Sequence, residues 1–211
     1  MTTIYFIRHS EPMKVKTRNY NDSIQLKNEK NILSVKGEKR AKVLSQLPEF
    51  DNIDLVVASN YVRTIATAKY VAEKNNLDIF IEEEFCERKQ GVEAWSDFPS
   101  DFEVKQMVDE YYKIGNGESQ IEVKERMYNA LLNILEQHKD KKIAIFSHGT
   151  AMCFLFKKWC HVIFEEVIWK MSFNDKMFFE NKFNAPEIFK LTFNDTELIS
   201  IQNIRPNELN F

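Results

Sequence analysis

Cysteine is scarce in this sequence, and the cysteines present are not spaced for pairing or for metal binding. The 211 residues include three cysteines, an odd number, with no CxxC motif and no spacing typical of a metal site. This pattern favours a reducing environment, so the sequence predicts a cytoplasmic protein whose thiols are packed in its interior. The three positions are Cys86, Cys153 and Cys160.

Long apolar runs are also missing. The longest are far below the roughly 18 residues that a membrane-spanning helix requires. The amino terminus lacks the basic start, the long apolar stretch and the small-residue cleavage site of a secretion signal. The sequence therefore predicts a soluble protein without a membrane partner.

Neither sign of charge dominates. The chain has 29 Lys and Arg residues against 32 Asp and Glu residues, which gives a formal net charge of −3 at pH 7. This balance argues against electrostatic capture of nucleic acid as the main activity. A site for an anion therefore has to be a local concentration of cations and not a property of the whole surface.

No repeat, low-complexity segment or linker rich in proline, glycine or serine divides the chain. With 44% hydrophobic residues to form a core, residues 1–211 are predicted to fold as one domain. Short segments of strand type alternate with segments of helical periodicity, which predicts a three-layer α/β/α sandwich with a mostly parallel sheet and helices on both faces. The predicted strands are Thr3–Ile7, Leu55–Ala58, Ile79–Ile81 and Ile143–Phe146, and the predicted helices are Val35–Leu47, Asn60–Lys74 with Ser59 as its N-cap, and Val123–His138.

Three further segments differ from this alternation. Apolar and polar residues alternate within Glu187–Thr192 and again within Leu198–Asn203, and Asn194-Asp195 lies between the two segments. This pattern predicts a C-terminal antiparallel hairpin at the edge of the sheet. The aromatic and acidic segment Phe98–Lys113 is predicted to form a helix that covers the site. The polar segment Asn19–Asn31 is predicted to be an exposed loop.

Cations and imidazoles follow the predicted strands at the edge where open α/β sheets bind ligands. Arg8 and His9 follow the first strand, Arg63 lies in the first turn of the helix after the second, and His148 and Gly149 follow the fourth. A guanidinium group donates to two phosphate oxygens at once. A neutral imidazole can attack phosphorus, and a second, protonated imidazole can stabilise charge on its oxygens. The pattern predicts phosphoryl transfer, with the nucleophile's pKa lowered by the arginines.

Transfer to a histidine also requires an acid for the leaving oxygen. The segment EEEFCERKQG follows the third predicted strand and brings carboxylates to the same edge. Glu87 is the preferred candidate, because a partly shielded carboxyl group can hold a proton near neutral pH. Glu83 and Glu84 are the alternatives.

The order of these motifs resembles the histidine phosphatase superfamily, whose fold is that of phosphoglycerate mutase. The resemblance runs through IYFIRHSE, LSVKGEKRA, VVASNYVRTIATA, FCERKQG, GES and IAIFSHGT. It implies that His9 is the nucleophile that becomes phosphorylated and that Glu87 is the proton donor. It implies that Arg8, Arg63 and His148 hold the phosphate. It also implies a small phosphorylated substrate, inorganic phosphate as product or inhibitor, and no metal or other cofactor.

The chain departs from the family pattern at three positions. Ser10 stands where a glycine is common, and Val15 stands where many members carry an asparagine that helps to hold phosphate. The segment Lys14–Asn21 is a candidate to replace that contact. The tryptophan after the acid motif is slightly displaced, at Trp95.

The spacing of two glycines separates the possible activities within the family. Cofactor-dependent mutases carry a long insertion between the acid motif and GES, whereas Gly91 and Gly117 are only 26 positions apart here. The sequence therefore predicts a phosphomonoesterase. The alternatives are a cofactor-dependent mutase and a catalytically weak domain that binds a phosphometabolite or a phosphoprotein. The oligomeric state does not follow from the sequence.

Overall fold

The computed structural model describes residues 1–15 and 22–206, and a six-stranded sheet lies at its centre. The strand order is β3-β2-β4-β1-β8-β9, where the first four strands are parallel and the last two are antiparallel to their neighbours. The four strands predicted from the first part of the chain are confirmed, with ends that agree within one residue. The strands of this sheet are β1 (Thr2–Arg8), β2 (Leu55–Ala58), β3 (Ile79–Ile81), β4 (Lys142–Ser147), β8 (Glu187–Asn194) and β9 (Glu197–Ile204).

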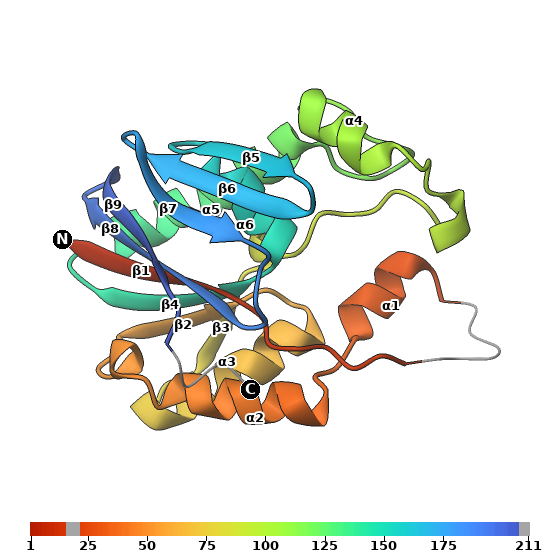
Figure 1. Ribbon diagram of the computed structural model, residues 1–211. Coiled ribbons are helices and arrows are strands. Elements are labelled where there is room, and N and C mark those ends of the chain that lie inside the picture. The colour runs from red at the N-terminus through yellow and green to blue at the C-terminus, as the bar shows by residue number, and fades with distance from the viewer. Residues whose placement is uncertain (16–21, 207–211) are drawn as a thin grey trace.

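Helices cover both faces of this sheet (Figure 1). Because successive side chains of a strand point to opposite faces, Tyr5 and Ile7 of β1 pack on one helix layer while Ile4 and Phe6 pack on the other. The three-layer sandwich and the C-terminal hairpin at its edge are confirmed. The first layer consists of α2 (Val35–Ser45) and α3 (Val62–Asn75), and the second of α5 (Gln120–Gln137) and α6 (Gly149–Phe156).

Two helix starts differ from the prediction. Helix α3 begins at Val62, after Tyr61 as N-cap, so Ser59 is not its N-cap. The Ser59 hydroxyl is held instead by two side chains, the Thr64 hydroxyl and the His148 ring. Helix α5 begins at Gln120, three residues before the predicted start, because a capping box is formed by Ser119 and Glu122.

The predicted loop Asn19–Asn31 is largely helical, so that prediction is wrong. Helix α1 spans Ile24–Lys30, and the Ser23 side chain caps it by accepting a hydrogen bond from the backbone N–H of Leu26, at 3.2 Å. Ile24 is buried and anchors the helix to the body of the protein. Residues 19–21 lie outside the described part of the chain.

A second, three-stranded antiparallel sheet was not predicted. It consists of β5 (His161–Glu165), β6 (Ile168–Phe173) and β7 (Lys176–Asn181), and it lies above the central sheet in Figure 1. Met171 and Phe179 are buried from this sheet in the same core as α5 and α6, and the Phe179 and Phe189 rings lie 5.3 Å apart. The second sheet therefore packs on the same side of the central sheet as α5 and α6.

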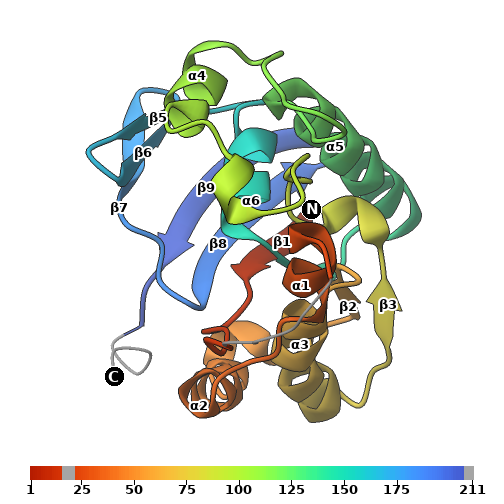
Figure 2. The same cartoon turned by 90° about the vertical axis from the view of Figure 1, so that its right-hand side faces the viewer.

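The predicted helix Phe98–Lys113 is much shorter in the structure. Only α4 (Phe102–Val108) is α-helical, and it follows the short 3-10 helix Trp95–Asp97. Figure 2 looks onto the carboxyl ends of the parallel strands, where α4 and the β5–β6 hairpin lie on one side and α1 toward the other. Together these segments surround the strand ends that carry the predicted site residues. In residues 1–15 and 22–206, no helix combines the length and the apolar character needed to cross a membrane.

Candidate active site

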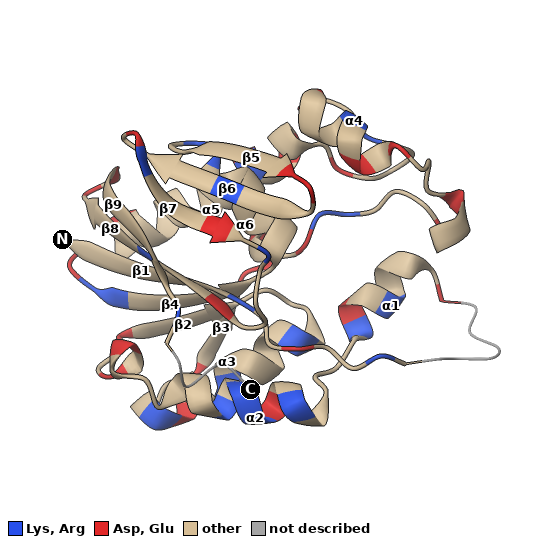
Figure 3. Cartoon of the chain, viewed as in Figure 1, with Lys and Arg blue, Asp and Glu red and all other residues tan. Residues whose placement is uncertain are grey.

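A cavity of about 340 Å³ opens at the carboxyl end of β1. Arg8, His9 and Glu87 line it, so three of the five predicted site residues share one space. Arg63 and His148 are buried directly behind it, and the His148 ring lies 5.2 Å from the His9 ring. The fold therefore brings all five residues together. Basic and acidic residues are interspersed over the helices shown in Figure 3.

His9 is held in one protonation state by its neighbours. Its Nδ1 lies 2.7 Å from the Ser10 carbonyl oxygen, which can only accept, so Nδ1 carries the hydrogen and Nε2 carries the lone pair. Burial, then Arg63 and Arg8, lower the pKa of His9 well below its usual value. The predicted lowering of this pKa is confirmed, although burial is the largest single cause. His9 is thus a neutral imidazole with a lone pair at Nε2.

His148 is also neutral in this geometry. Arg63 donates from Nη2 to His148 Nδ1 over 2.9 Å, and a guanidinium group has no lone pair to accept with, so Nδ1 is unprotonated. The Nε2–H group then donates to the Ser59 hydroxyl oxygen, at 2.8 Å. Burial, with Arg63 as the next cause, lowers the pKa of His148 well below its usual value. The expectation of a protonated His148 is therefore wrong for this arrangement.

Arg63 lies in the first turn of α3, as predicted, and is almost fully buried. Its Nη1 donates to the backbone carbonyl of Asn28 in α1, and its guanidinium lies 4.9 Å from the centre of the Tyr61 ring. The Tyr61 hydroxyl in turn accepts from Gln25 of α1, at 2.7 Å. Burial lowers the pKa of Arg63 to about 10. Arg63 and Tyr61 therefore hold α1 against the buried residues behind the cavity.

Arg8 has a donor without a protein partner at the wall of the cavity. Its Nη1 donates to the carbonyl oxygens of Phe183 and Asn184, at 3.1 and 3.0 Å. Its Nε is buried and has no hydrogen-bond partner among the described residues. A buried donor costs free energy unless an acceptor reaches it, so Arg8 is suited to bind an anion.

Glu87 is the one of the three candidate acids that lines the cavity. Glu83 and Glu84 belong to the 3-10 helix Glu83–Phe85 and are exposed to solvent outside it. Glu87 Oε1 accepts from two backbone N–H groups, those of Arg88 at 2.9 Å and Ala151 at 3.0 Å. These bonds fix the carboxyl group through Oε1, and Oε2 has no hydrogen-bond partner among the described residues.

The two buried histidines should make the protein less stable below about pH 6.5. Burial lowers both pKa values in the folded state from the usual histidine value of about 6.5. Below that pH the unfolded chain binds protons at these rings that the folded chain does not bind. Stability therefore falls as the pH drops, by up to about 1.4 kcal/mol per pH unit for each ring. Urea unfolding between pH 5 and 7.5 measures this slope.

Matched variants assign the slope to the site. His9→Asn removes one titrating ring, so its free energy of unfolding should depend less steeply on pH in this range. His161 is exposed at the start of β5, and His161→Asn should leave the slope as in the wild type. Equal slopes for wild type and His9→Asn would contradict the assignment.

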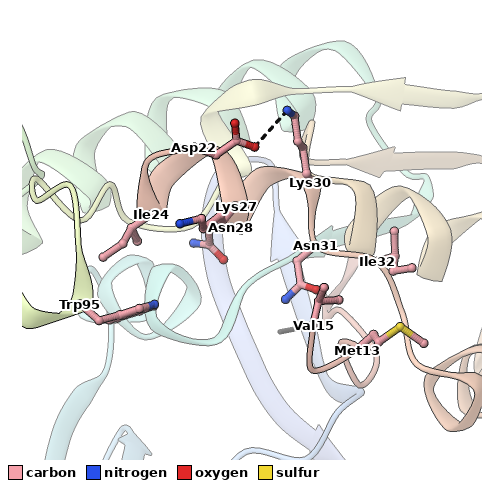
Figure 4. Close-up of a pocket in the computed structure, with 10 residues that line it drawn as sticks. All are labelled: Met13, Val15, Asp22, Ile24, Lys27, Asn28, Lys30, Asn31, Ile32 and Trp95. Atoms are coloured by element: carbon pink, nitrogen blue, oxygen red, sulfur yellow. Dashed lines mark hydrogen bonds and ion pairs between the residues drawn. The ribbon is translucent and has the colours of Figure 1, made fainter. Parts of the chain in front are cut away.

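A second pocket of about 380 Å³ lies beside α1 (Figure 4). Val15 and Trp95, two of the positions that depart from the family pattern, line it together with Lys27 and Asn28 of α1. None of the five predicted site residues lines this pocket. Val15 is 61% exposed and supplies no polar group, and most of the Lys14–Asn21 segment lies outside the described residues. The cavity at His9 is therefore the candidate active site.

No group of three or more His, Cys, Asp or Glu side chains is arranged to hold a metal ion in residues 1–15 and 22–206. The three cysteines are free thiols in the interior, as predicted. Burial raises the pKa of Cys153 well above its usual value, which keeps this thiol protonated near the site.

A comparison of the sequence with protein-family profiles identifies the family of this chain. The profile of the histidine phosphatase superfamily (branch 1) matches residues 4–176. The chain belongs to the histidine phosphatase superfamily. This result confirms the family that the sequence motifs indicated, and it agrees with the order of the site residues along the chain.

Proteins similar to this chain include a phosphatase and a probable mutase. The phosphoserine phosphatase 1 of Hydrogenobacter thermophilus is 30% identical over 129 residues, which span 57% of this chain and 60% of that protein. The probable phosphoglycerate mutase GpmB of Escherichia fergusonii is 27% identical over 160 residues, 72% of each chain. This chain of the histidine phosphatase superfamily thus aligns with less than two thirds of the first relative.

Solved structures of two phosphatases share the fold at lower identity. The phosphoserine phosphatase of Entamoeba histolytica, solved with 3-phosphoglyceric acid, has a TM-score of 0.66 and 17% identity over 99% of this chain and 100% of that chain. A mycobacterial glucosyl-3-phosphoglycerate phosphatase has a TM-score of 0.65 and 15% identity over 95% and 96% of the two chains. These likenesses establish the fold.

Sequence reasoning missed three charged residues that also line the cavity, which are Arg88, Glu103 and Lys182. Arg88 is adjacent to Glu87 in the sequence, so its position could have been inferred from that of the candidate acid. Glu103 lies in α4 and Lys182 follows β7. No motif connects these two segments to the strand ends, and only the tertiary structure brings them together.

Proposed function

We propose that this histidine phosphatase is a phosphomonoesterase that forms a phosphohistidine on His9 and requires no metal. The observation that carries the proposal is the protonation state of His9, whose Nδ1–H is held by the Ser10 carbonyl while Nε2 keeps its lone pair. This neutral ring lies at a cavity between Arg8 and the buried Arg63–His148 pair. A neutral nucleophile beside fixed cations is what attack on a phosphate ester requires.

The proposed reaction has two steps. His9 Nε2 attacks phosphorus, a P–N bond forms and the P–O bond to the alcohol breaks, while Glu87 Oε2 gives its proton to the leaving oxygen. The Glu87 carboxylate then accepts a proton from water, which attacks phosphorus and breaks the P–N bond. Inorganic phosphate leaves, and Glu87 has regained its proton. Arg8 donates to the phosphate oxygens through both steps. Arg63 and His148 donate to them once their hydrogen bonds to each other and to Ser59 give way to the phosphate.

A small phosphorylated metabolite in the cytoplasm is the proposed substrate. The names of the relatives, phosphoserine phosphatase and phosphoglycerate mutase, support this class of substrate. A similar structure, that of the mycobacterial phosphatase, was solved with inorganic phosphate, which supports phosphate as product or inhibitor. The short α4 between Gly91 and Gly117 supports hydrolysis over return of the phosphoryl group to a second substrate.

The test is hydrolysis of p-nitrophenyl phosphate after dialysis against EDTA, combined with chemical trapping. The rate should be unchanged by EDTA, and an alkaline quench during turnover should retain an acid-labile phosphoryl group on the wild-type chain. Peptide mapping should locate that group at His9. A rate that depends on added Mg²⁺ or Zn²⁺, or a phosphoryl group on another residue, would overturn the mechanism. Transfer of the phosphoryl group from the protein to an added hydroxy acid, faster than to water, would instead indicate a mutase.

A further inference from the structure

Three charged side chains at the cavity have no part in the proposed phosphoryl transfer. Glu103 comes from the first turn of α4, Lys182 follows β7, and Arg88 follows Glu87. They share one cavity with Arg8 and His9. Because His9 marks the position of phosphorus, these three side chains belong to the part of the cavity available to the alcohol of the substrate.

Two of these charged groups have no hydrogen bond or ion pair to the described residues, although Glu103 and Arg88 attract each other electrostatically. In residues 1–15 and 22–206, the Glu103 carboxylate and the Lys182 ammonium group have no hydrogen bond or ion pair. Lys105 shows the contrast, since on the same helix as Glu103 it forms an ion pair with Asp101 at 2.8 Å. Two charges of opposite sign that face one cavity without pairing are both available to a ligand.

Arg88 adds a second cationic donor at this wall. Its two terminal nitrogens are used by Gln106 and by Gln90, the latter at 3.0 Å. Its Nε is buried and has no partner among the described residues. The buried Nε–H is therefore a donor without an acceptor, and an anionic group beside Arg88 would satisfy it.

The remaining wall limits the size of the alcohol. Phe164, Trp169 and Phe183 line the cavity, and Val167 lies at the tip of the β5–β6 hairpin beside it. Val167 has a φ of 65°, a left-handed conformation that is strained for a β-branched residue. Strain of this kind persists where the surrounding structure holds it, often at a ligand site. Within about 340 Å³, the cavity has room for a phosphate and a small alcohol.

We propose that Glu103, Lys182 and Arg88 form a leaving-group subsite for a small zwitterion, an alcohol that carries both an ammonium group and a carboxylate. Lys182 and the Nε of Arg88 take the carboxylate, and Glu103 takes the ammonium group. The subsite rests on the proposed function, because the phosphate of the same ester has to lie at His9. Unlike a wall of one sign, this wall disfavours esters whose alcohol carries only one of the two charges, since the other protein charge stays unpaired.

Four phosphate monoesters that differ mainly in the charge of the alcohol test the subsite. They are O-phosphoserine with both charges, phosphoethanolamine with the ammonium group alone, phosphoglycolate with the carboxylate alone, and glycerol phosphate with neither. The expected kcat/KM is at least about 10-fold higher for O-phosphoserine than for glycerol phosphate, with intermediate values for the other two. Equal values, or a preference for the neutral ester, would overturn the subsite.

Charge-removing variants assign the preference to individual residues. Glu103→Gln should lower kcat/KM for phosphoethanolamine relative to phosphoglycolate, and Lys182→Gln should change this ratio in the opposite direction. The matched controls are Glu125→Gln on α5 and Lys176→Gln on β7, exposed residues outside the cavity, which should leave the ratio unchanged. A ratio that is the same in wild type, Glu103→Gln and Lys182→Gln would contradict the assignment.

The outcome for the subsite is separable from that for the proposed function. If the enzyme hydrolyses p-nitrophenyl phosphate through a phosphohistidine but does not discriminate among the four esters, the subsite is wrong and the reaction stands. If no phosphohistidine forms at His9, the reaction is wrong and the subsite falls with it.

Discussion

Replacing His9 by asparagine should lower kcat for p-nitrophenyl phosphate by at least about 10³-fold, which corresponds to about 4 kcal/mol of activation free energy. The variant removes the Nε2 lone pair that is proposed to attack phosphorus. The asparagine amide can still donate to the Ser10 carbonyl, which accepts from Nδ1 of His9 in the wild type. The position therefore keeps its hydrogen bond while it loses its nucleophile, and the fold should be retained.

Steady-state kinetics and circular dichroism on the same preparation check this expectation. His161→Asn is the matched control, because this histidine is exposed and lies outside the cavity, and its kcat should equal that of the wild type. A folded His9→Asn protein with a rate within tenfold of the wild type would show that another group is the nucleophile.

Glu87→Gln should lower kcat by an amount that depends on the leaving group. Glutamine can accept the backbone hydrogen bonds that Glu87 Oε1 receives from Arg88 and Ala151, but it cannot give a proton to the leaving oxygen. General acid catalysis contributes typically about 10²- to 10⁴-fold. We therefore expect a loss of at least about 10²-fold for an alkyl phosphate. The loss should be smaller for p-nitrophenyl phosphate, whose leaving group needs no proton.

The ratio of the two losses is the measurement. Glu84→Gln is the control, because Glu84 is exposed and lies outside the cavity, and it should slow neither substrate. Equal losses on both substrates would mean that Glu87 positions other groups and is not the acid. Loss of the alkyl phosphate activity in Glu84→Gln would move the role to that residue.

The strands and the positions of the site residues could be predicted because local signals set them. Short apolar runs that end in polar residues mark β1, β2 and β4, and the sheet then brings Arg8 and His148 to the same edge. Arg63 was predictable in the same way from its place in the first turn of α3. In these cases the residues that follow parallel strands meet at the carboxyl edge of the sheet, so their positions follow from the sequence pattern.

Features that depend on tertiary contacts could not be predicted. Helix α1 is short and polar, and it is held by the burial of Ile24 and by Arg63, which is distant in sequence. The β5–β6 turn carries Glu166 and Val167, neither of which is a usual residue for a hairpin turn, although Asn174-Asp175 at the next turn is a usable signal. The neutral state of His148 follows from the direction of the Arg63 hydrogen bond, which spacing along the chain does not reveal.

The place of β1 in the sheet determines how the site opens during hydrogen exchange. This strand pairs with β4 over Thr3–Arg8 and with β8 over Thr2–Arg8, so it has a full ladder on each side and no free edge. Segments of this kind exchange their amide hydrogens mainly through global unfolding, whereas short surface helices such as α1 and α4 open locally at much lower free energy. His9 therefore directly follows one of the last segments expected to open. Helix α4, which lines the cavity through Glu103 and Met107, is expected to open locally without unfolding of the whole protein.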